Sequence, residues 1–182
     1  MKFTPLSVVG SYLVEPEPVV DERGFFARTF CHEEFARHGL NPELMQCSVS
    51  FNRRSGTLRG MHYQKQPHEE AKLVRCTTGA IHDVVLDLRT GSPSFLKWAA
   101  VELSADNRSA IYIPEGCAHG FLTLTDASEV YYQISIGYHP ESAAGVRWDD
   151  PAFGIEWPCA DFIISERDSN FESWGHVANA SV

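Results

Sequence analysis

The sequence predicts an all-β fold of the sandwich or closed-barrel type. Between residues 57 and 138, short stretches rich in aliphatic and aromatic residues alternate with breaks that contain Gly, Pro, Asn or Asp. Many short strands at nearly even spacing, without helical periodicity between them, are typical of such folds. Apolar residues also alternate in 111–113 and 132–136, as they do along strands that bury one face.

The expected elements can be placed along the chain in order. Residues 7–20 are expected to form one or two opening strands, broken by Pro16 and Pro18, because proline cannot donate to a β ladder. Short helices are expected at residues 31–40, which contain a glycine stop, and at 165–171. Residues 114–120 are interpreted as a turn, and the chain after residue 141 as loops. The other strands are expected at residues 25–30, 45–53, 57–64, 71–77, 81–88, 98–103, 109–113, 120–124 and 129–138.

The bulk properties exclude several classes of protein. A chain of 182 residues without an internal repeat or linker is expected to form one domain, residues 1–182. Its formal charge of −9 argues against a nucleic-acid binder, which needs clustered Lys and Arg. No signal peptide is recognisable, and no stretch approaches the roughly eighteen apolar residues of a membrane span. Five cysteines without CxxC spacing favour reduced thiols, so we expect a cytoplasmic protein.

The stretch 58–64 brings a cation, a glycine, an imidazole and a carboxamide together. Gly56, His62 and Glu69 have the spacing of the first signature of the cupin type of jelly roll. The second signature, Pro-x-Gly-x-x-His, is matched by the segment that ends in His119. We therefore expect a cupin-type jelly-roll barrel or sandwich with a few short peripheral helices.

His62 has three candidate roles: metal ligand, proton acceptor or hydrogen-bonded core residue. A catalytic iron, manganese or zinc site needs about three strong ligands, usually two or three of them imidazoles. Gln64 stands where the first cupin signature has its second histidine, which leaves at best His62, Glu69 and His119. Because a neutral amide is a poor ligand, the sequence favours a site with no metal and no other cofactor.

Other polar residues favour proton transfer. Lys72 shares a strand face with Val74, so it either points inward with that residue or reaches solvent from the strand end. Tyr132 and Tyr138 have the parity of their apolar neighbours and are predicted to face the interior. Asp168 either orients an imidazole or is a solvated surface acid. A histidine base, a tyrosine acid and a lysine beside a developing oxyanion suit proton transfer at carbon next to a carbonyl.

Longer motifs extend over nearly the whole chain, in order and at matching spacing. They lie in residues 21–26, 58–64, 72–76, 83–89, 113–121 and 154–158. In these motifs the sequence resembles the dTDP-4-dehydrorhamnose 3,5-epimerase family. The resemblance implies a metal-free cupin jelly roll, usually a homodimer, that acts on a nucleotide-linked 4-keto-6-deoxyhexose.

The same resemblance implies roles for individual residues. His62 matches the general base and Asp168 its dyad partner, while Tyr132 matches the acid that reprotonates from the opposite face. Lys72 matches the residue near the C4 oxygen, where negative charge develops. The remaining matches are substrate contacts: Arg59 and His119, Arg23 and Phe26 at the nucleotide and in part from the partner subunit, Tyr138 stacked near the base, and Arg167 as a basic contact.

Three places depart from the family pattern. Arg28 stands where many members have glutamate, residues 46–50 replace a Gln-Asp-Asn run, and Ala143 replaces a glutamate, with Glu141 close by. All three bear on nucleotide binding and none belongs to the proton-transfer set. The resemblance therefore implies the chemistry more firmly than the identity of the base, for which dTDP is the first expectation.

The leading hypothesis is an isomerase that epimerises C3 and C5, converting dTDP-4-dehydro-6-deoxy-D-glucose to dTDP-4-dehydro-L-rhamnose. Alternatives are a C3-only or C5-only epimerase, a keto-isomerase, a metal-dependent cupin and a non-catalytic sugar-binding cupin. Retention of both His62 and Tyr132 favours an epimerase over a keto-isomerase, because a proton must leave one face of the sugar and return to the other.

Overall fold

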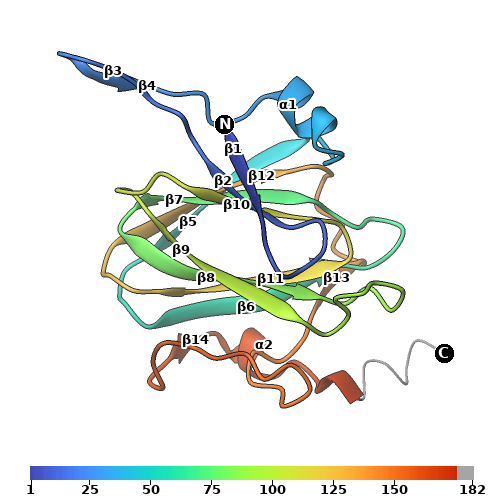
Figure 1. Ribbon diagram of the computed structural model, residues 1–182. Helices are drawn as coiled ribbons and strands as arrows, with labels where there is room; N and C mark the ends of the chain where they lie inside the picture. The colour runs from blue at the N-terminus through green and yellow to red at the C-terminus, as the bar shows by residue number, and fades with distance from the viewer. Residues whose placement is uncertain (176–182) are drawn as a thin grey trace.

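The computed structural model describes residues 1–175, which form two main sheets packed face to face (Figure 1). One sheet has the strand order β1-β2-β10-β7-β12-β5, and all its neighbours pair antiparallel. In that order its strands are Lys2–Pro5, Tyr12–Glu15, Ala110–Ile113, Lys72–Thr78, Ser128–Ile134 and Gln46–Asn52. We call it the upper sheet, after its position in Figure 1.

The lower sheet has the order β13-β6-β11-β8-β9, and the short strand β14 adds to β6 in parallel. Its strands are Ala143–Gly145, Thr57–Gln64, Cys117–Thr123, Ala80–Asp87, Trp98–Ser104 and, for β14, Ile163–Ile164. The strands β3 (Val19–Asp21) and β4 (Gly24–Phe26) form a separate hairpin that projects from the sandwich. Helix α1 (His32–Arg37) lies near the upper sheet and α2 (Glu166–Ser169) beneath the lower one (Figure 1).

The core lies between the two sheets because their strands alternate apolar side chains as expected. Along β8, Ile81 and Val85 pack between the sheets, whereas Val84 and Leu86 point to the outer face of the lower sheet. The C-terminal segment covers that outer face with aromatic residues such as Trp157. Both faces of the lower sheet are therefore buried, which fixes the register of β6. Within the described residues, no helix is long and apolar enough to span a membrane.

The structure confirms the predicted all-β jelly-roll sandwich with short peripheral helices, and it corrects several boundaries. The predicted turn at residues 114–120 ends at Gly116, which has a positive φ, and Cys117 already pairs with Asp87 in the ladder of β11 and β8. Strands β1, β13 and β14 were not predicted, and β4 ends at Phe26. Strand β12 ends at Ile134, and Tyr138 beyond it is exposed, so the prediction that Tyr138 faces the interior is wrong. Because β7 begins at Lys72, no strand among residues 1–175 pairs with residues 135–138 on that side.

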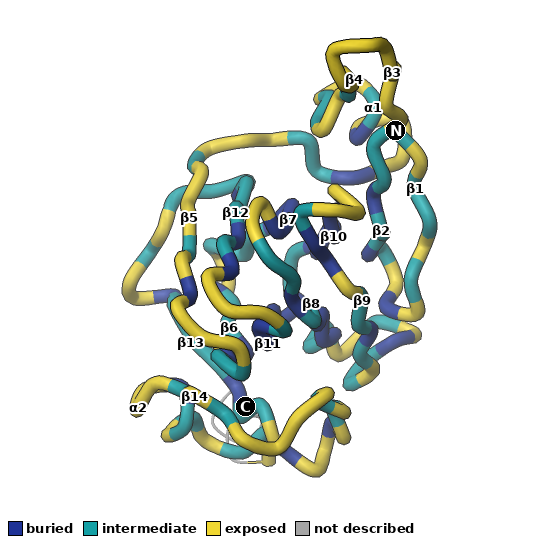
Figure 2. The backbone as a smooth tube through the Cα atoms, turned by 90° about the vertical axis from the view of Figure 1, so that its left-hand side faces the viewer, coloured by how far each residue is buried: buried dark blue, intermediate teal, exposed yellow. Residues whose placement is uncertain are grey.

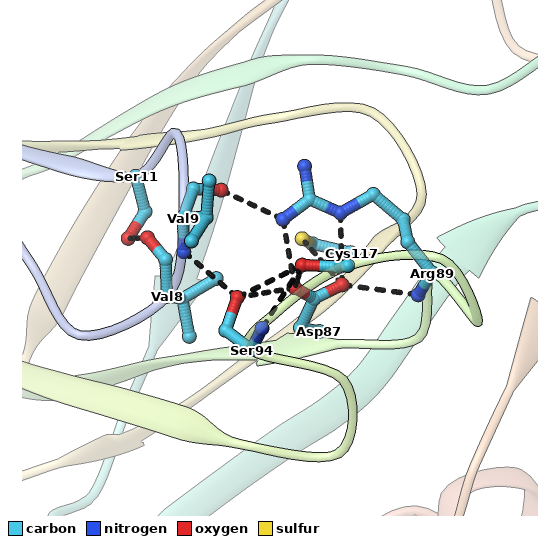
Figure 3. Close-up of polar contacts among 8 residues, drawn as sticks. Val8, Val9, Ser11, Asp87, Arg89, Ser94 and Cys117 are labelled. Atoms are coloured by element: carbon cyan, nitrogen blue, oxygen red, sulfur yellow. Dashed lines mark hydrogen bonds and ion pairs between the residues drawn. The ribbon is translucent and has the colours of Figure 1, made fainter.

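A buried carboxylate ties the first turn of the chain to the sandwich (Figure 3). Asp87 is fully buried and accepts hydrogen bonds from Arg89, Ser92 and Ser94, at 2.6–2.8 Å from their side chains. Arg89 also donates to the carbonyl oxygen of Val9, and Ser94 Oγ accepts from the Val9 amide. Burial by itself raises the pKa of Asp87, but these hydrogen bonds outweigh it and lower the pKa to about 2.

We predict that Asp87→Asn lowers the free energy of unfolding by about 3 kcal/mol at pH 7, because Arg89 loses its buried ionic partner. The depressed pKa means that this carboxylate stabilises the protein above pH ~4 and that the contribution, about 2 kcal/mol, is lost as the pH falls towards 2. Urea unfolding of both proteins at pH 7 and near pH 2.5 measures these differences.

Asp21→Asn is the matched control. Asp21 and Arg23 repeat the Asp-x-Arg spacing and the side-chain and backbone hydrogen bonds of Asp87 and Arg89, but on the exposed hairpin. An exposed ion pair contributes little, so this variant should unfold like the wild type. Equal losses in the two variants would contradict the role given to Asp87.

Candidate active site

The register of β6 places two chemically important side chains on the inner face of the lower sheet. His62 pairs with His119 and Arg59 with Phe121, so three steps along β6 match two steps along β11. Because of this shift, Arg59 and His62 share the face of His119 and Phe121 instead of alternating. Arg59 Nε reaches Asn52 Oδ1 of the upper sheet at 2.8 Å, which shows that its side chain crosses between the sheets.

His62 forms a dyad with Asp168 of α2. The distance from His62 Nε2 to Asp168 Oδ1 is 2.8 Å, and Gly60 N donates to Asp168 Oδ2 at 3.3 Å. Asp168 is itself held by its helix, because its backbone N–H donates to the N-cap side chain of Ser165. Asp168 is 5% exposed, so its interpretation as a solvated surface acid is wrong.

The dyad leaves one nitrogen of His62 available as a base. Burial raises the pKa of Asp168, but the hydrogen bonds and charge of His62 and the amide of Gly60 outweigh burial and lower it. Asp168 is therefore ionised near neutral pH and can only accept. His62 Nε2 donates to it, which assigns the free lone pair to Nδ1. The His62 side chain is 39% exposed, so this lone pair is accessible to a ligand.

A second carboxylate–histidine pair lies deeper in the sandwich. His119 Nε2 is 3.0 and 2.9 Å from the two carboxylate oxygens of Asp83, and both residues are buried. The ring of His119 meets that of Tyr132 edge-on, with centroids 5.9 Å apart. His119 therefore connects β6, through its pairing with His62, to the upper sheet that carries Tyr132.

Tyr132 faces the interior from the upper sheet, as predicted, and packs against the core between the sheets. Burial raises the pKa of its phenol, the charge of Asp83 raises it further, and Arg59 partly opposes both. The phenol therefore remains protonated near neutral pH and is a proton donor. His62 and Tyr132 come from opposite sheets, so a ligand between them meets a base on one side and an acid on the other.

Lys72 is buried at the start of β7 and points inward with Val74, so the inward alternative for this lysine is confirmed. Its Nζ lies 2.7 Å from Glu70 Oε1, and this carboxylate offsets the cost of burying the ammonium. Glu70 occupies one of the three donors of Nζ, which leaves the others for a ligand.

A pocket of about 180 Å³ opens beside the dyad and is lined in part by His62, Gln64, Glu70, Tyr138 and Arg167. Tyr138 is 58% exposed, and Arg167 lies over the ring of Phe171, which in turn packs edge-on against His62. The structure therefore brings the predicted residues Tyr138 and Arg167 to the rim of the pocket that contains His62.

Arg23 and Phe26 lie away from the pocket that contains His62. Both belong to the hairpin of β3 and β4, where Arg23 pairs with Asp21 and Phe26 is 79% exposed. Figure 1 shows this hairpin standing clear of the sandwich, on the side away from α2 and β6. Within one chain, the structure does not bring these two predicted nucleotide contacts to His62.

The side chain of Gln64 forms hydrogen bonds with backbone groups of two loops. Its amide nitrogen donates to the carbonyl oxygens of His68 and Gly137, and its oxygen accepts from the N–H of His139. Glu69, the acid of the cupin signature, lies on the far side of this loop beside Gly116. His62, Gln64 and His119 are thus engaged in separate hydrogen-bonded groups.

Sequence reasoning missed three partners of the predicted residues: Asp83, Glu70 and Asn52. Asp83 had a signal, since it is an acid with the parity of Ile81 and Val85 inside an apolar strand. Glu70 precedes Lys72 by two residues but lies outside the strand, and Asn52 meets Arg59 from the opposite sheet. No sequence pattern indicates those two contacts.

Comparison with known proteins identifies the family. Residues 5–175 match the family of dTDP-4-dehydrorhamnose 3,5-epimerase. The chain belongs to this family. The epimerase of that name from Methanothermobacter thermautotrophicus is 44% identical over 174 residues, which cover 94% of this chain and 93% of the relative.

Solved structures of family members agree with the fold. The dTDP-4-dehydrorhamnose 3,5-epimerase of Elizabethkingia anophelis is 36% identical, covers 97% of both chains and superposes with a TM-score of 0.94. A 3'-monoepimerase from Streptomyces bikiniensis in complex with dTDP-quinovose is 35% identical, with a TM-score of 0.89 over 97% of this chain and 90% of that one. The chain is therefore similar in fold both to 3,5-epimerases and to a 3'-monoepimerase.

We predict that Asp168→Asn slows proton transfer by about 10²–10⁴-fold through the His62 tautomer. If the carbonyl of the new carboxamide keeps the bond to Gly60 N, its N–H group must face His62 Nε2, which then has to accept. The imidazole proton then lies on Nδ1, so this nitrogen has no free lone pair with which to accept a proton from the substrate. Nitrogen-15 NMR of the imidazole reports the tautomer independently of activity. Asp149→Asn, at an exposed pair with Arg147, is the control; an unchanged tautomer at full rate would contradict the dyad.

Proposed function

We propose that the protein epimerises a dTDP-linked 4-keto-6-deoxyhexose at C3 and C5, converting dTDP-4-dehydro-6-deoxy-D-glucose to dTDP-4-dehydro-L-rhamnose. The observation that carries this proposal is the placement of His62, with Asp168 behind it, on one sheet and Tyr132 on the sheet opposite. Inversion at carbon needs a base and an acid on opposite faces of the sugar, and this arrangement supplies both.

In the proposed mechanism, His62 Nδ1 removes the proton from C3 or C5 and becomes an imidazolium that Asp168 stabilises. The electron pair moves into the C4 carbonyl to give an enolate, whose oxygen is stabilised by the ammonium of Lys72. Tyr132 then donates its phenolic proton to the carbon from the other face. Burial and the charge of Asp83 raise the pKa of Tyr132, and the charge of Arg59, which partly opposes that rise, favours the phenolate that forms.

The binding roles are proposed from the same geometry. Arg59 and His119 line the interior beside Tyr132, while Tyr138 and Arg167 at the pocket rim are placed to contact the nucleotide. The three departures from the family pattern lie apart from the dyad: Arg28 pairs with Glu34 at 3.0 Å, and Ala143 pairs with Gln64 at the edge of β6. Residues 46–50 lie in β5, where Ser48 pairs with Tyr132 of β12. We keep dTDP as the proposed nucleotide because similar solved structures hold TDP or a dTDP-linked sugar.

We also infer that the working form is a homodimer and that residues 1–182 act as one domain. Figure 2 shows the hairpin of β3 and β4 as exposed chain, and Val19, Val20 and Phe26 on it are each more than 70% exposed. The edge strand β5 exposes Val49 and Phe51 as well. Such apolar surface is typical of interfaces, and a second copy would also explain why Arg23 and Phe26 lie away from His62. Five unpaired cysteines support a cytoplasmic location.

Incubation with dTDP-4-dehydro-6-deoxy-D-glucose in D₂O tests the reaction. We expect deuterium at both C3 and C5 by NMR. His62→Asn should abolish exchange at both carbons, a loss of at least about 10²-fold. Tyr132→Phe should allow exchange by His62 but prevent inversion. Exchange in the His62→Asn variant at the wild-type rate would remove His62 from the base role.

The same spectra distinguish the second candidate, a single epimerase, which the Streptomyces bikiniensis 3'-monoepimerase favours. Deuterium at C3 alone, with an unlabelled C5, would replace the double-epimerase proposal by this one. Binding of dTDP without any exchange would instead support a sugar-binding protein.

Light scattering coupled to gel filtration tests the dimer. Phe26→Asp and Phe51→Asp, which place charge on the exposed apolar surfaces of the hairpin and β5, are expected to shift the mass from two chains to one. Val9→Asp adds the same charge at a half-exposed valine in the first turn and should leave the dimer intact. A monomeric wild-type protein would contradict the dimer without affecting the proposed chemistry.

A further inference from the structure

Two histidines outside the proposed catalytic set form a pair beside Gln64. The rings of His68 and His139 stack with their centroids 3.6 Å apart and an interplanar angle of 7°. Gln64 fixes the pair, since its amide donates to the carbonyl oxygen of His68 and accepts from the N–H of His139. The two loops, residues 65–71 and 135–142, are thus held together beneath two imidazoles.

A carboxylate completes the group. Glu141 Oε1 lies 3.2 Å from His139 Nδ1, and one ligand atom from each of His68, His139 and Glu141 falls within 4.8 Å of the others. Among residues 1–175, these are the His, Cys, Asp and Glu side chains that converge in this way.

We propose that His68, His139 and Glu141 bind one divalent transition-metal ion of the Zn²⁺ class. Two imidazoles and a carboxylate are ligands that zinc prefers, and solvent supplies a fourth. With Zn–N and Zn–O bonds of about 2.0 Å, the donors of a tetrahedral site lie ~3.3 Å apart. The pair of His139 Nδ1 and Glu141 Oε1 already has this separation, and His68 reaches it by rotation of its ring.

Binding replaces one hydrogen bond by coordination. The proton that His139 Nδ1 donates to Glu141 moves to Nε2, so the ring binds as a neutral ligand. His68 Nδ1 bonds to the hydroxyl of Ser142, which can donate or accept and so can adapt to either tautomer. The Glu141 side chain is 65% exposed and that of His139 36%, which gives the ion a path from solvent.

The site is separate from the proposed proton-transfer residues, and the inference does not rest on the proposed function. His62 and His119 point to Asp168 and Asp83 and contribute no ligand. The ion would instead link the loop that contains Glu70 to the loop that contains Tyr138, and both residues line the pocket. Because no proton-transfer residue is a ligand of the ion, epimerase activity should survive removal of the metal by a chelator.

Titration of the tag-free, chelator-treated protein with Zn²⁺ and with Co²⁺ tests the site. Calorimetry should show one Zn²⁺ per chain, and Co²⁺ should give visible absorption bands typical of a nitrogen–oxygen site. His139→Gln and Glu141→Gln should each weaken binding at least tenfold. Glu141 is exposed, so its variant keeps the test valid if the histidine variant misfolds.

His32→Gln is the matched control, because His32 lies 3.8 Å from Glu43 in another exposed histidine–glutamate pair that has no second imidazole. Its Zn²⁺ affinity should equal that of the wild type. Zn²⁺ binding that is absent in the wild type, or equally strong in the Glu141→Gln and His139→Gln variants, would overturn the proposal.

Discussion

The two hydrogen bonds of Asp168 are the constraint on which the site depends. Strand β6 pairs with β14 at Thr57 and Leu58 and with β13 at His62 to Gln64, so the edge amide of Gly60 lies between the two partner strands. One oxygen of Asp168 accepts from that amide, and the other accepts from His62. A single carboxylate thus replaces a missing strand partner and assigns the imidazole tautomer. The same carboxylate therefore positions α2 against β6 and orients the imidazole of His62.

Burial accounts for the distribution of charge around the site. Buried ionised groups between two sheets are costly unless each has a partner, and here His119 has Asp83 and Lys72 has Glu70. Arg59 is exposed and bonds to the buried Asn52. Each pair leaves part of its hydrogen-bonding capacity unused and directed at the interior. A polar interior of this kind can bind a sugar and stabilise an enolate while the surrounding apolar core remains intact.

Gln64 stands where the cupin signature has a second histidine, and this difference changes what the position does in the barrel. An imidazole at this position would point a metal ligand at the interior, whereas the amide has both a donor and an acceptor. It uses them to join the loops that precede Lys72 and follow Ile134. The residue that weakens the metal signature at the centre of the barrel therefore joins two loops, and the rings of His68 and His139 stack where these loops meet.

The sequence by itself determined the sandwich, most strand positions, the inward direction of Tyr132, and the family motifs, because these follow from alternation along a strand and from local spacing. For Lys72 it left two directions open, and the structure decided for the inward one. Contacts between distant segments needed the tertiary structure. Asp168 is 106 residues from His62, and its sequence context is that of a surface helix. Tyr138 keeps the parity of β12 but lies beyond its last paired residue. Alternation gives the direction of a side chain only while the strand continues, and only the fold determines where a strand ends and which carboxylate meets an imidazole.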